Sequence, residues 1–236
     1  MVGVGNDGAV ARDALRACGL FAGLDAPSLE LVAGALRSRR FRKGEVVFHA
    51  GDPGDALFIV AAGHVKITLP ADDGSEPAIL TTVGPGGFFG ELALLDGQPR
   101  SATATTVEPT ETLSLPRDVF RELLDKHPEL RDALFAALAN LLRRLTKHVE
   151  ELHFLDLAGR LAARLAQLAR QGHPGATHAI ELDWPYTQSD LAAMIGGTRQ
   201  SVNKLLTGLV DDDLLHIDHE TLIINDLERL EAHGAR

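Results

Sequence analysis

The sequence predicts an α+β protein with three consecutive parts: a β-roll of the jelly-roll type, one long helix, and a winged helix-turn-helix. Three observations predict this architecture. Short β-favouring runs alternate with Gly, Pro and Asp turns between Phe41 and Leu115. Apolar residues then recur at helical spacing from Pro128 to about Leu155, and residues 187–206 form two helical patterns joined by two glycines. We place the domains at 1–127, 128–155 and 156–236.

The composition is that of an ordinary globular protein. The chain has 236 residues, of which 45% are hydrophobic and 24% are charged. No apolar run approaches the roughly 20 residues that span a bilayer. The first residues lack the basic start and apolar core of a signal peptide. We therefore expect a cytoplasmic protein that does not associate with membranes.

Several chemical functions find no support in the sequence. The single cysteine, Cys18, excludes an intramolecular disulfide and an iron–sulfur cluster held by cysteines alone. No Ser-His-Asp set, metal-spaced histidine pair or phosphate-binding loop of the nucleotide triphosphatases is visible. We expect no enzymatic activity, no metal and no tightly bound cofactor.

The first half begins with helices and continues as strands. Residues 11–36 read as short helices, and Asp25-Ala-Pro-Ser28 is typical of a helix start. Many short strands with regular turns predict a compact antiparallel roll. We expect the strands at 46–48, 57–60, 65–69, 78–83, 102–107 and 112–115.

A long helix should follow the roll. Residues 117–124 are helical in pattern, and Pro128 is well placed in the first turn of a helix that runs to about Leu155. An apolar seam along it has nearly the period of a coiled coil. The seam consists of Leu134, Leu138, Leu141, Leu145, Val149 and Leu152. It either packs only on the chain's own roll or, with Leu142 and Leu155 widening it, also meets a second copy; we favour a homodimer helix.

The C-terminal part predicts a helix-turn-helix followed by a wing. Residues 154–159 read as a hinge, 160–171 as a helix and 180–182 as a short strand; 214–217 and 221–224 read as a terminal hairpin. Thr187 and Asp190 have the spacing of a capping box, Gly196-Gly197 permits a sharp turn, and Thr198 caps the second helix. The buried stripe of that helix is Val202, Leu205, Leu206 and Leu209.

The second helix then presents a polar edge suited to DNA. Arginine matches the two acceptors of guanine, and glutamine matches the donor and acceptor of adenine. The DNA-binding candidates are Thr187, Gln188, Arg199, Gln200, Ser201 and Lys204. The alternative is a helical hairpin used only for packing.

The net charge argues for few DNA contacts. It is −10 for the whole chain, and from Leu157 onward there are seven basic and eleven acidic residues. Since duplex DNA is bound largely through its phosphates, the affinity should depend on a few placed contacts and on dimerisation, and should be salt-sensitive.

A second motif, Phe88 to Leu95 with Arg100-Ser101, predicts a pocket for an anion. Gly90 lets the backbone approach a ligand, and a helical turn that begins near Glu91 points free N–H groups at a phosphate. Arg100 adds a bidentate cation and Ser101 a hydroxyl, whereas the acceptor-only Glu91 suits a sugar hydroxyl. The alternative is a Glu91–Arg100 salt bridge within a turn.

Together these residues resemble the cyclic-AMP receptor protein/fumarate–nitrate regulator superfamily of bacterial transcription factors. The resemblance extends from about Leu20 to Leu227. It is carried by Gly90-Glu91-Leu92, Arg100-Ser101-Ala102, residues 154–160 and residues 198–204. It implies a homodimer with a cyclic-nucleotide-binding roll, a dimerisation helix and a winged helix-turn-helix. It also implies cyclic AMP as allosteric effector, a palindromic operator in double-stranded DNA, and RNA polymerase as a partner.

The resemblance assigns roles and shows two departures. The nucleotide candidates are Gly90, Glu91, Leu92, Arg100, Ser101 and Thr146. In the cyclic-AMP receptor branch that gives the family its name, a Thr-Ser pair on the long helix contacts adenine. The matching positions here are Leu145, which cannot hydrogen-bond to a base, and Thr146, which keeps one polar contact. Gln200 replaces a glutamate, which implies a different base pair in the operator. Two alternatives stay open: a regulator that is ligand-independent or responds to a cyclic dinucleotide, and a cyclic-nucleotide-binding module that contacts protein, which the acidic balance favours.

Overall fold

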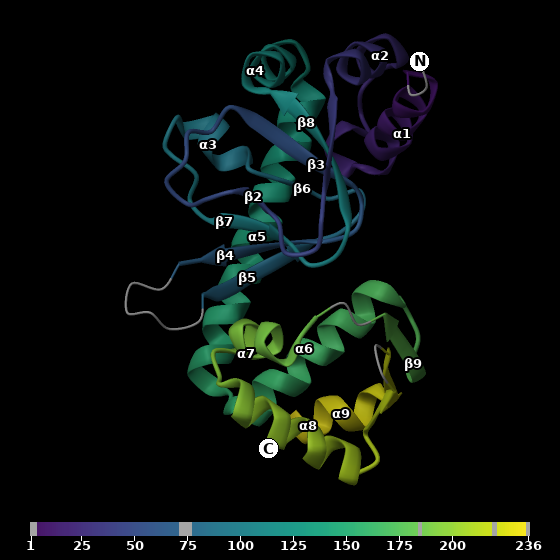
Figure 1. Ribbon diagram of the computed structural model, residues 1–236, viewed down its shortest axis with the longest axis vertical. Helices are drawn as coiled ribbons and strands as arrows, with labels where there is room; N and C mark the ends of the chain where they lie inside the picture. Colours follow the sequence, from purple (N-terminus) through teal and green to yellow (C-terminus); the bar gives the residue numbers. More distant parts are fainter. Residues whose placement is uncertain (1–3, 71–76, 184–185, 219–220, 235–236) are drawn as a thin grey trace. The chain divides into compact units, whose positions relative to one another are not determined.

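The computed structural model describes residues 4–70, 77–183, 186–218 and 221–234 (Figure 1). It divides into two compact units, residues 1–143 and 144–236. Within the described ranges, no helix is long and apolar enough to cross a membrane.

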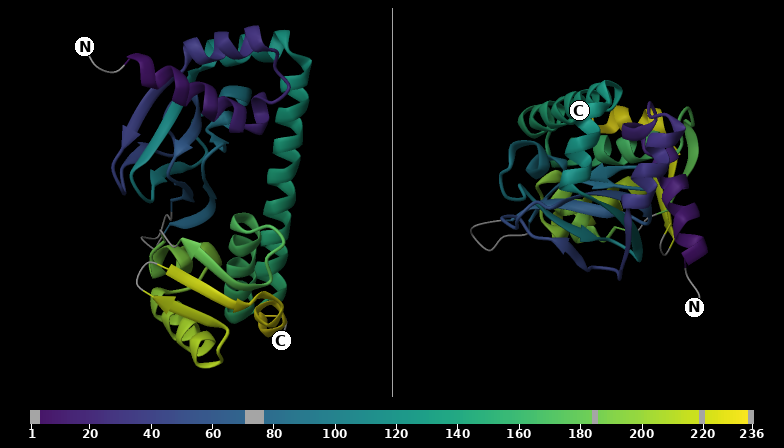
Figure 2. Two further views of the ribbon diagram at one scale, coloured as in Figure 1. Left: turned by 90° about the vertical axis from the view of Figure 1, so that its right-hand side faces the viewer. Right: turned by 90° about the horizontal axis from the view of Figure 1, so that it is seen from above.

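The N-terminal helices are confirmed in the predicted region, but the first begins at Val4, seven residues before the expected start at residue 11. They are α1 (Val4–Ala17), the 3-10 helix η1 (Gly19–Phe21) and α2 (Ala26–Ala35). The Asp25 side chain accepts a hydrogen bond from the Ser28 backbone N–H at 2.9 Å, so the predicted helix start is confirmed. Figure 2 shows α1 and α2 lying across one end of the strands.

The roll consists of two four-stranded sheets in the described part of the chain. Their orders are β1-β8-β3-β6 and β2-β7-β4-β5, with antiparallel pairing throughout. The predicted strands are confirmed to within a few residues. The strands are β1 (Arg37–Phe41), β2 (Val46–Phe48), β3 (Ala56–Ala62), β4 (Val65–Leu69), β5 (Ala78–Val83), β6 (Phe88–Phe89), β7 (Thr103–Thr106) and β8 (Thr110–Pro116).

Two strands of the roll were not predicted. β6 has only two residues, and β1 has the sequence Arg-Ser-Arg-Arg-Phe, of which only Phe41 is buried. Apolar runs are the signal that predicts a strand, and an edge strand whose side chains face solvent has none. The backbone of β1 is held instead by its ladder with β8.

Helices close the apolar end of the roll. The core there contains residues of α1, η1, β3 and β8 together with Phe120 of α4 (Arg117–Lys126) and Leu130 and Leu134 of α5 (Pro128–Phe154). Cys18 lies in this core, and burial raises the pKa of its thiol to about 11. A buried thiol with a raised pKa stays protonated at neutral pH and is therefore unreactive.

The apolar seam of α5 is not one face. Leu134 is buried in the core of the first unit, and Leu138 packs against that core. By contrast Phe135, Leu142 and Val149, seven residues apart, are 65%, 66% and 64% exposed. The helix therefore carries an inner apolar stripe that packs on the roll and an outer stripe of Phe135, Leu142 and Val149 that is exposed, which is the arrangement expected if one face meets the roll; contact of the other face with a second copy stays a prediction.

The C-terminal unit has the predicted winged arrangement. Its elements are α6 (Leu157–Gly172), β9 (His178–Asp183), α7 (Gln188–Ile195), α8 (Arg199–Asp211), β10 (Leu215–Asp218), β11 (Thr221–Asp226) and α9 (Leu227–Gly234). The described strands form a sheet of order β10-β11-β9. α6 begins earlier than expected because Asp156 accepts from the Gly159 N–H at 2.8 Å, which leaves Leu155 and Asp156 as the non-helical link. α9, which packs on α6, was not predicted.

Burial of Phe120 should be a major contribution to the stability of the first unit. We expect Phe120→Ala to lower the free energy of unfolding by about 3–5 kcal/mol, since it leaves a cavity in a fully enclosed site. Chemical denaturation measures this change. Leu31→Ala is the control, because Leu31 is 60% exposed on α2. Equal losses for the two variants would contradict the described core.

Candidate functional site

Gly90 stands between β6 and the short helix α3 (Glu91–Asp96) in a conformation that favours glycine. Its φ is +84°, in the left-handed region, and a Cβ there would lie 2.6 Å from Nη1 of Arg100. The predicted helical turn at Glu91 is confirmed. Gly90 therefore lets the backbone pass directly beside the Arg100 guanidinium.

Arg100 is the best-buried cation of this site, at 4% exposure. Nη1 donates to the Gly90 carbonyl at 2.6 Å, and Nη2 donates to the Ala56 carbonyl at 2.7 Å. The guanidinium carbon lies 4.3 Å from the ring centroid of Phe48 and 5.7 Å from that of Phe58. Nε–H is buried and has no hydrogen-bond partner among the described residues.

The charge of Arg100 is only partly compensated. Burial lowers the pKa of the guanidinium, and the carboxylates of Asp55 and Glu91 oppose that shift. Asp55, whose side chain is 88% exposed, lies 3.6 Å from Nη2. A buried cation with an unused donor is suited to receive an anion.

Glu91 is buried beside this cation. Burial raises the pKa of its carboxyl group, and the nearby Arg100 charge lowers it. Among the ion pairs of the described residues, the carboxylate within 4.0 Å of Arg100 belongs to Asp55, so the alternative of a Glu91–Arg100 salt bridge is not the arrangement observed. Glu91 thus keeps acceptor oxygens for another hydroxyl or N–H group.

The remaining nucleotide candidates are exposed. Leu92 lies on α3 at 37% exposure, and the Ser101 side chain faces solvent next to Arg100. Thr146 is exposed on α5 in the second unit, and Leu145 is half-buried. The structure therefore brings Gly90, Glu91 and Arg100 into contact range and leaves Leu92 and Ser101 at the rim of the same loops.

The aromatic support of Arg100 was not predicted from the sequence. Phe48, Phe58 and Phe89 come from β2, β3 and β6, and their ring centroids lie 5.3–5.8 Å apart. No spacing along the chain connects these residues to Arg100, because the sheets bring them together.

The helix-turn-helix has the predicted caps. The Asp190 N–H donates to Thr187 Oγ1 at 3.1 Å, and the Thr187 N–H donates to the Asp190 carboxylate at 2.9 Å, which is a complete capping box. Gly196 has φ +68°, and Thr198 accepts from the Ser201 N–H at 3.1 Å. These bonds fix the start of both helices.

The polar side chains of α8 lie on its solvent-exposed face. Val202, Leu206 and Leu209 are buried, and Leu205 is half-buried. The side chains of Arg199, Gln200, Asn203 and Lys204 are exposed. Two candidates have local hydrogen bonds: Gln188 donates to Asn203 at 3.0 Å, and the Ser201 hydroxyl lies 2.9 Å from that of Thr198.

Arg160, to which the sequence assigned no role beyond the start of a helix, holds the turn between α7 and α8. Its Nη1 donates to the Ile195 carbonyl at the end of α7 at 2.8 Å. A Cβ at Gly197 would lie 2.8 Å from Leu157. The turn between α7 and α8 is therefore seated on the first turn of α6.

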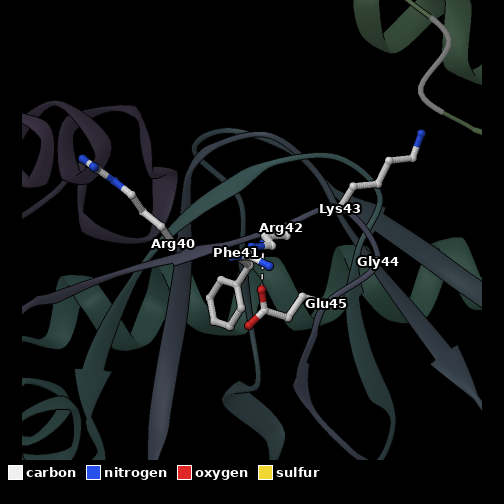
Figure 3. Close-up of a pocket in the computed structure, with 6 residues that line it drawn as sticks. All are labelled: Arg40, Phe41, Arg42, Lys43, Gly44 and Glu45. Atoms are coloured by element: carbon white, nitrogen blue, oxygen red, sulfur yellow. Dashed lines mark hydrogen bonds between the residues drawn. The ribbon is translucent and has the colours of Figure 1, made fainter.

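One open hollow lies apart from these residues, at the turn between β1 and β2. It has a volume of about 720 Å³ and is lined by Arg40, Phe41, Arg42, Lys43, Gly44 and Glu45 (Figure 3). No motif in this run had indicated a function.

Known proteins share both halves of this chain. Residues 38–127 match the cyclic nucleotide-binding domain, and residues 159–233 match the Crp-like helix-turn-helix domain. The CRP-like cAMP-activated global transcriptional regulator of Mycobacterium tuberculosis is 35% identical over 222 residues, which cover 94% of this chain and 98% of that protein. The cyclic AMP receptor protein of Thermus thermophilus is 32% identical over 212 residues, with coverage of 90% and 94%.

Solved structures agree with this result. The structure of CLP, a c-di-GMP responsive global regulator of Xanthomonas campestris, aligns with a TM-score of 0.72 at 26% identity, over 85% of this chain and 99% of that one. The fold, the two matched domains and the near full-length similarity lead to one conclusion: the chain belongs to the CRP/FNR superfamily of bacterial transcription regulators.

Proposed function

We propose that this protein is a homodimeric, sequence-specific transcription regulator whose roll binds cyclic AMP. The observation that carries the proposal is the buried Arg100, whose Nε–H has no partner among the described residues, beside Gly90 and Glu91. The cyclic phosphate would bind Arg100 and Ser101 with backbone N–H groups near Gly90 and Leu92. Glu91 would accept from the ribose hydroxyl, and Thr146 would contact the purine.

The three proposed parts have separate tasks. Residues 1–127 bind the effector, residues 128–155 form the dimer helix, and residues 156–236 bind DNA. A nucleotide shifts such a dimer toward its DNA-binding arrangement only if it binds that arrangement more tightly. We propose that Leu155 and Asp156, the link between α5 and α6, accommodate this change.

The C-terminal unit would read a palindromic operator in the cytoplasm, with RNA polymerase as a further partner. Arg199, Gln200 and Lys204 lie exposed on α8 and would contact bases or phosphates. Thr187, Gln188 and Ser201 would help to position the duplex.

A second candidate effector is a cyclic dinucleotide. Leu145 favours it, because this side chain offers no hydrogen bond to adenine at the position where the resemblance places a polar residue. CLP, at 26% identity, is described as responsive to c-di-GMP. Titration calorimetry with cyclic AMP, cyclic GMP and cyclic di-GMP distinguishes the two candidate effectors.

Arg100→Lys should weaken cyclic AMP binding by about 1.5–3 kcal/mol, the value of a hydrogen bond to a charged group. Lysine keeps the charge but lacks the planar guanidinium, whose several N–H groups can donate to two carbonyls and a phosphate at the same time. Arg121→Lys is a matched control, because Arg121 also donates to a carbonyl of α3, that of Leu94 at 3.2 Å. Calorimetric affinity for cyclic AMP that is equal in wild type and Arg100→Lys would refute the pocket.

Val149→Glu should produce monomers. Val149 is 64% exposed on the outer stripe of α5, so a glutamate there costs little in the isolated chain but places two charges in a dimer seam. Sedimentation equilibrium should give half the wild-type mass, while far-ultraviolet circular dichroism should show unchanged helix content. Asn140→Glu, on an exposed position of the same helix, should stay dimeric. A dimeric Val149→Glu protein would exclude this seam.

A selection from random duplex DNA, run with and without cyclic AMP, should enrich a palindrome only with the nucleotide. Its half-sites should lie one turn apart, about 34 Å. In Arg199→Ala the preference for one guanine should fall by about 1–3 kcal/mol. An equal loss on all sequences would make Arg199 a phosphate contact, and no enriched palindrome would favour a module that binds protein instead.

A further inference from the structure

Two histidines of α5, His148 and His153, lie beside its outer stripe. The His148 side chain is 36% exposed, and His153 is exposed. They are five positions apart, which rotates one ring from the other by about 140° around the helix. The two rings therefore cannot hold one ion within a single copy. Within one copy, the described residues also include no group of three or more His, Cys, Asp or Glu suited to a metal.

The heptad register of α5 places these histidines at the two borders of the proposed dimer seam. The outer stripe recurs every seven residues, and the leucines three positions after its members do the same. Alternating steps of three and four are those of the a and d positions of a coiled coil. His148 then occupies a g position and His153 an e position. The a positions are Phe135, Leu142 and Val149, and the d positions are Leu138, Leu145 and Leu152.

A dimer in this register brings the histidines of different copies together. Both copies must present their C-terminal units to one duplex, so the two α5 helices of the proposed dimer run parallel. In a parallel pair, a g residue meets the e residue that lies five positions further along the partner helix. His148 therefore meets His153 of the partner subunit. The two-fold symmetry of the dimer repeats this pair on the other side of the seam.

Neighbouring side chains orient both rings. Oε2 of Glu151, one turn after His148, lies 3.9 Å from the His148 Nδ1 atom, so Nε2 is on the opposite side of the ring. A carboxylate beside one nitrogen of a histidine is the usual support of a metal-binding imidazole. The His153 ring makes an edge contact with Phe154, with centroids 4.9 Å apart and an interplanar angle of 84°. Glu151 also lies 3.9 Å from Nζ of Lys147, so one carboxylate serves two side chains.

We propose that each side of the dimer seam binds one Zn²⁺ ion through His148 of one copy and His153 of the partner subunit, with water completing the coordination. Neutral imidazole is a preferred ligand of zinc and related transition-metal ions, whereas Mg²⁺ prefers oxygen ligands. The proposal rests on the proposed homodimer and adds a ligand that only the dimer can bind. Zinc should therefore stabilise the dimer.

The first measurement is the dimer dissociation constant of the tag-free protein, freed of metal by chelation, from sedimentation equilibrium. Zn²⁺ at about ten times its dissociation constant should lower the dimer dissociation constant about 100-fold, because two sites each contribute by mass action. Mg²⁺ at the same concentration should leave it unchanged. Titration calorimetry should find one zinc site per chain.

The variants H148Q and H153Q should each abolish both sites, because each removes one ligand from both sides of the seam. H173Q is the matched control, since His173 is exposed outside α5, and it should keep wild-type zinc binding. Val149→Glu retains both histidines but separates the copies, so it should lose both sites.

Mixing H148Q with H153Q tests whether the two ligands come from different copies. In a mixed dimer one side of the seam has two glutamines, and the other side regains both histidines. After subunit exchange, half of the dimers are mixed and carry one site each. The mixture should therefore bind about a quarter of the zinc that wild type binds, although neither variant binds it alone.

The outcomes separate this proposal from the proposed function. A dimeric wild type that binds zinc no better than H148Q, or a mixture that regains no binding, overturns the zinc site and leaves the dimer intact. The two histidines would then be ordinary solvated side chains. A wild type that stays monomeric with and without zinc, cyclic AMP and operator DNA overturns the homodimer on which both proposals rest.

Discussion

The site in the roll depends on one constraint: a guanidinium is buried at Arg100 and must be compensated. Burying a charge is costly unless hydrogen bonds and opposite charge replace water. Two carbonyls and the faces of Phe48 and Phe58 supply part of this compensation, and the exposed Asp55 supplies little. The Arg100 Nε–H has no acceptor in the part of the chain that the structure describes, and an anion would supply one. The buried guanidinium also requires glycine at position 90, where the chain turns into α3, because a Cβ at that residue would displace the guanidinium.

The same constraint explains how the two carboxylates near Arg100 differ. Asp55 is solvated and screened, so it stabilises the cation weakly. Glu91 is buried, and burial raises its pKa, so its charged form is costly in the absence of a donor. A ligand that carries an anion and a hydroxyl donor together would satisfy both groups. A nucleotide with a free ribose hydroxyl and a phosphate has this combination.

Local signals made most of the fold predictable. The capping residues Asp25, Thr187 and Thr198 act within one helical turn, so their roles can be inferred from spacing alone, and the Gly196-Gly197 turn follows from backbone freedom. β1 could not be found in this way, because its stability comes from pairing with β8. The aromatic support of Arg100 and the Arg160 bond to Ile195 likewise depend on contacts between distant segments.

The seating of the helix-turn-helix on α6 limits where the C-terminal unit can change. Arg160 donates a hydrogen bond to the carbonyl at the end of α7, and the Leu157 side chain fills the space beside Gly197. The buried side of α6 completes the core that α7 and α8 share. A rotation of α8 relative to α6 would break the Arg160 bond and open a gap at Leu157. Close-packed interiors resist such partial displacement. The non-helical link at Leu155 and Asp156 is less constrained, since its side chains are half-buried and exposed, respectively. The two helices of the helix-turn-helix should therefore move together with α6, and an effector would change their position through the link rather than through the turn.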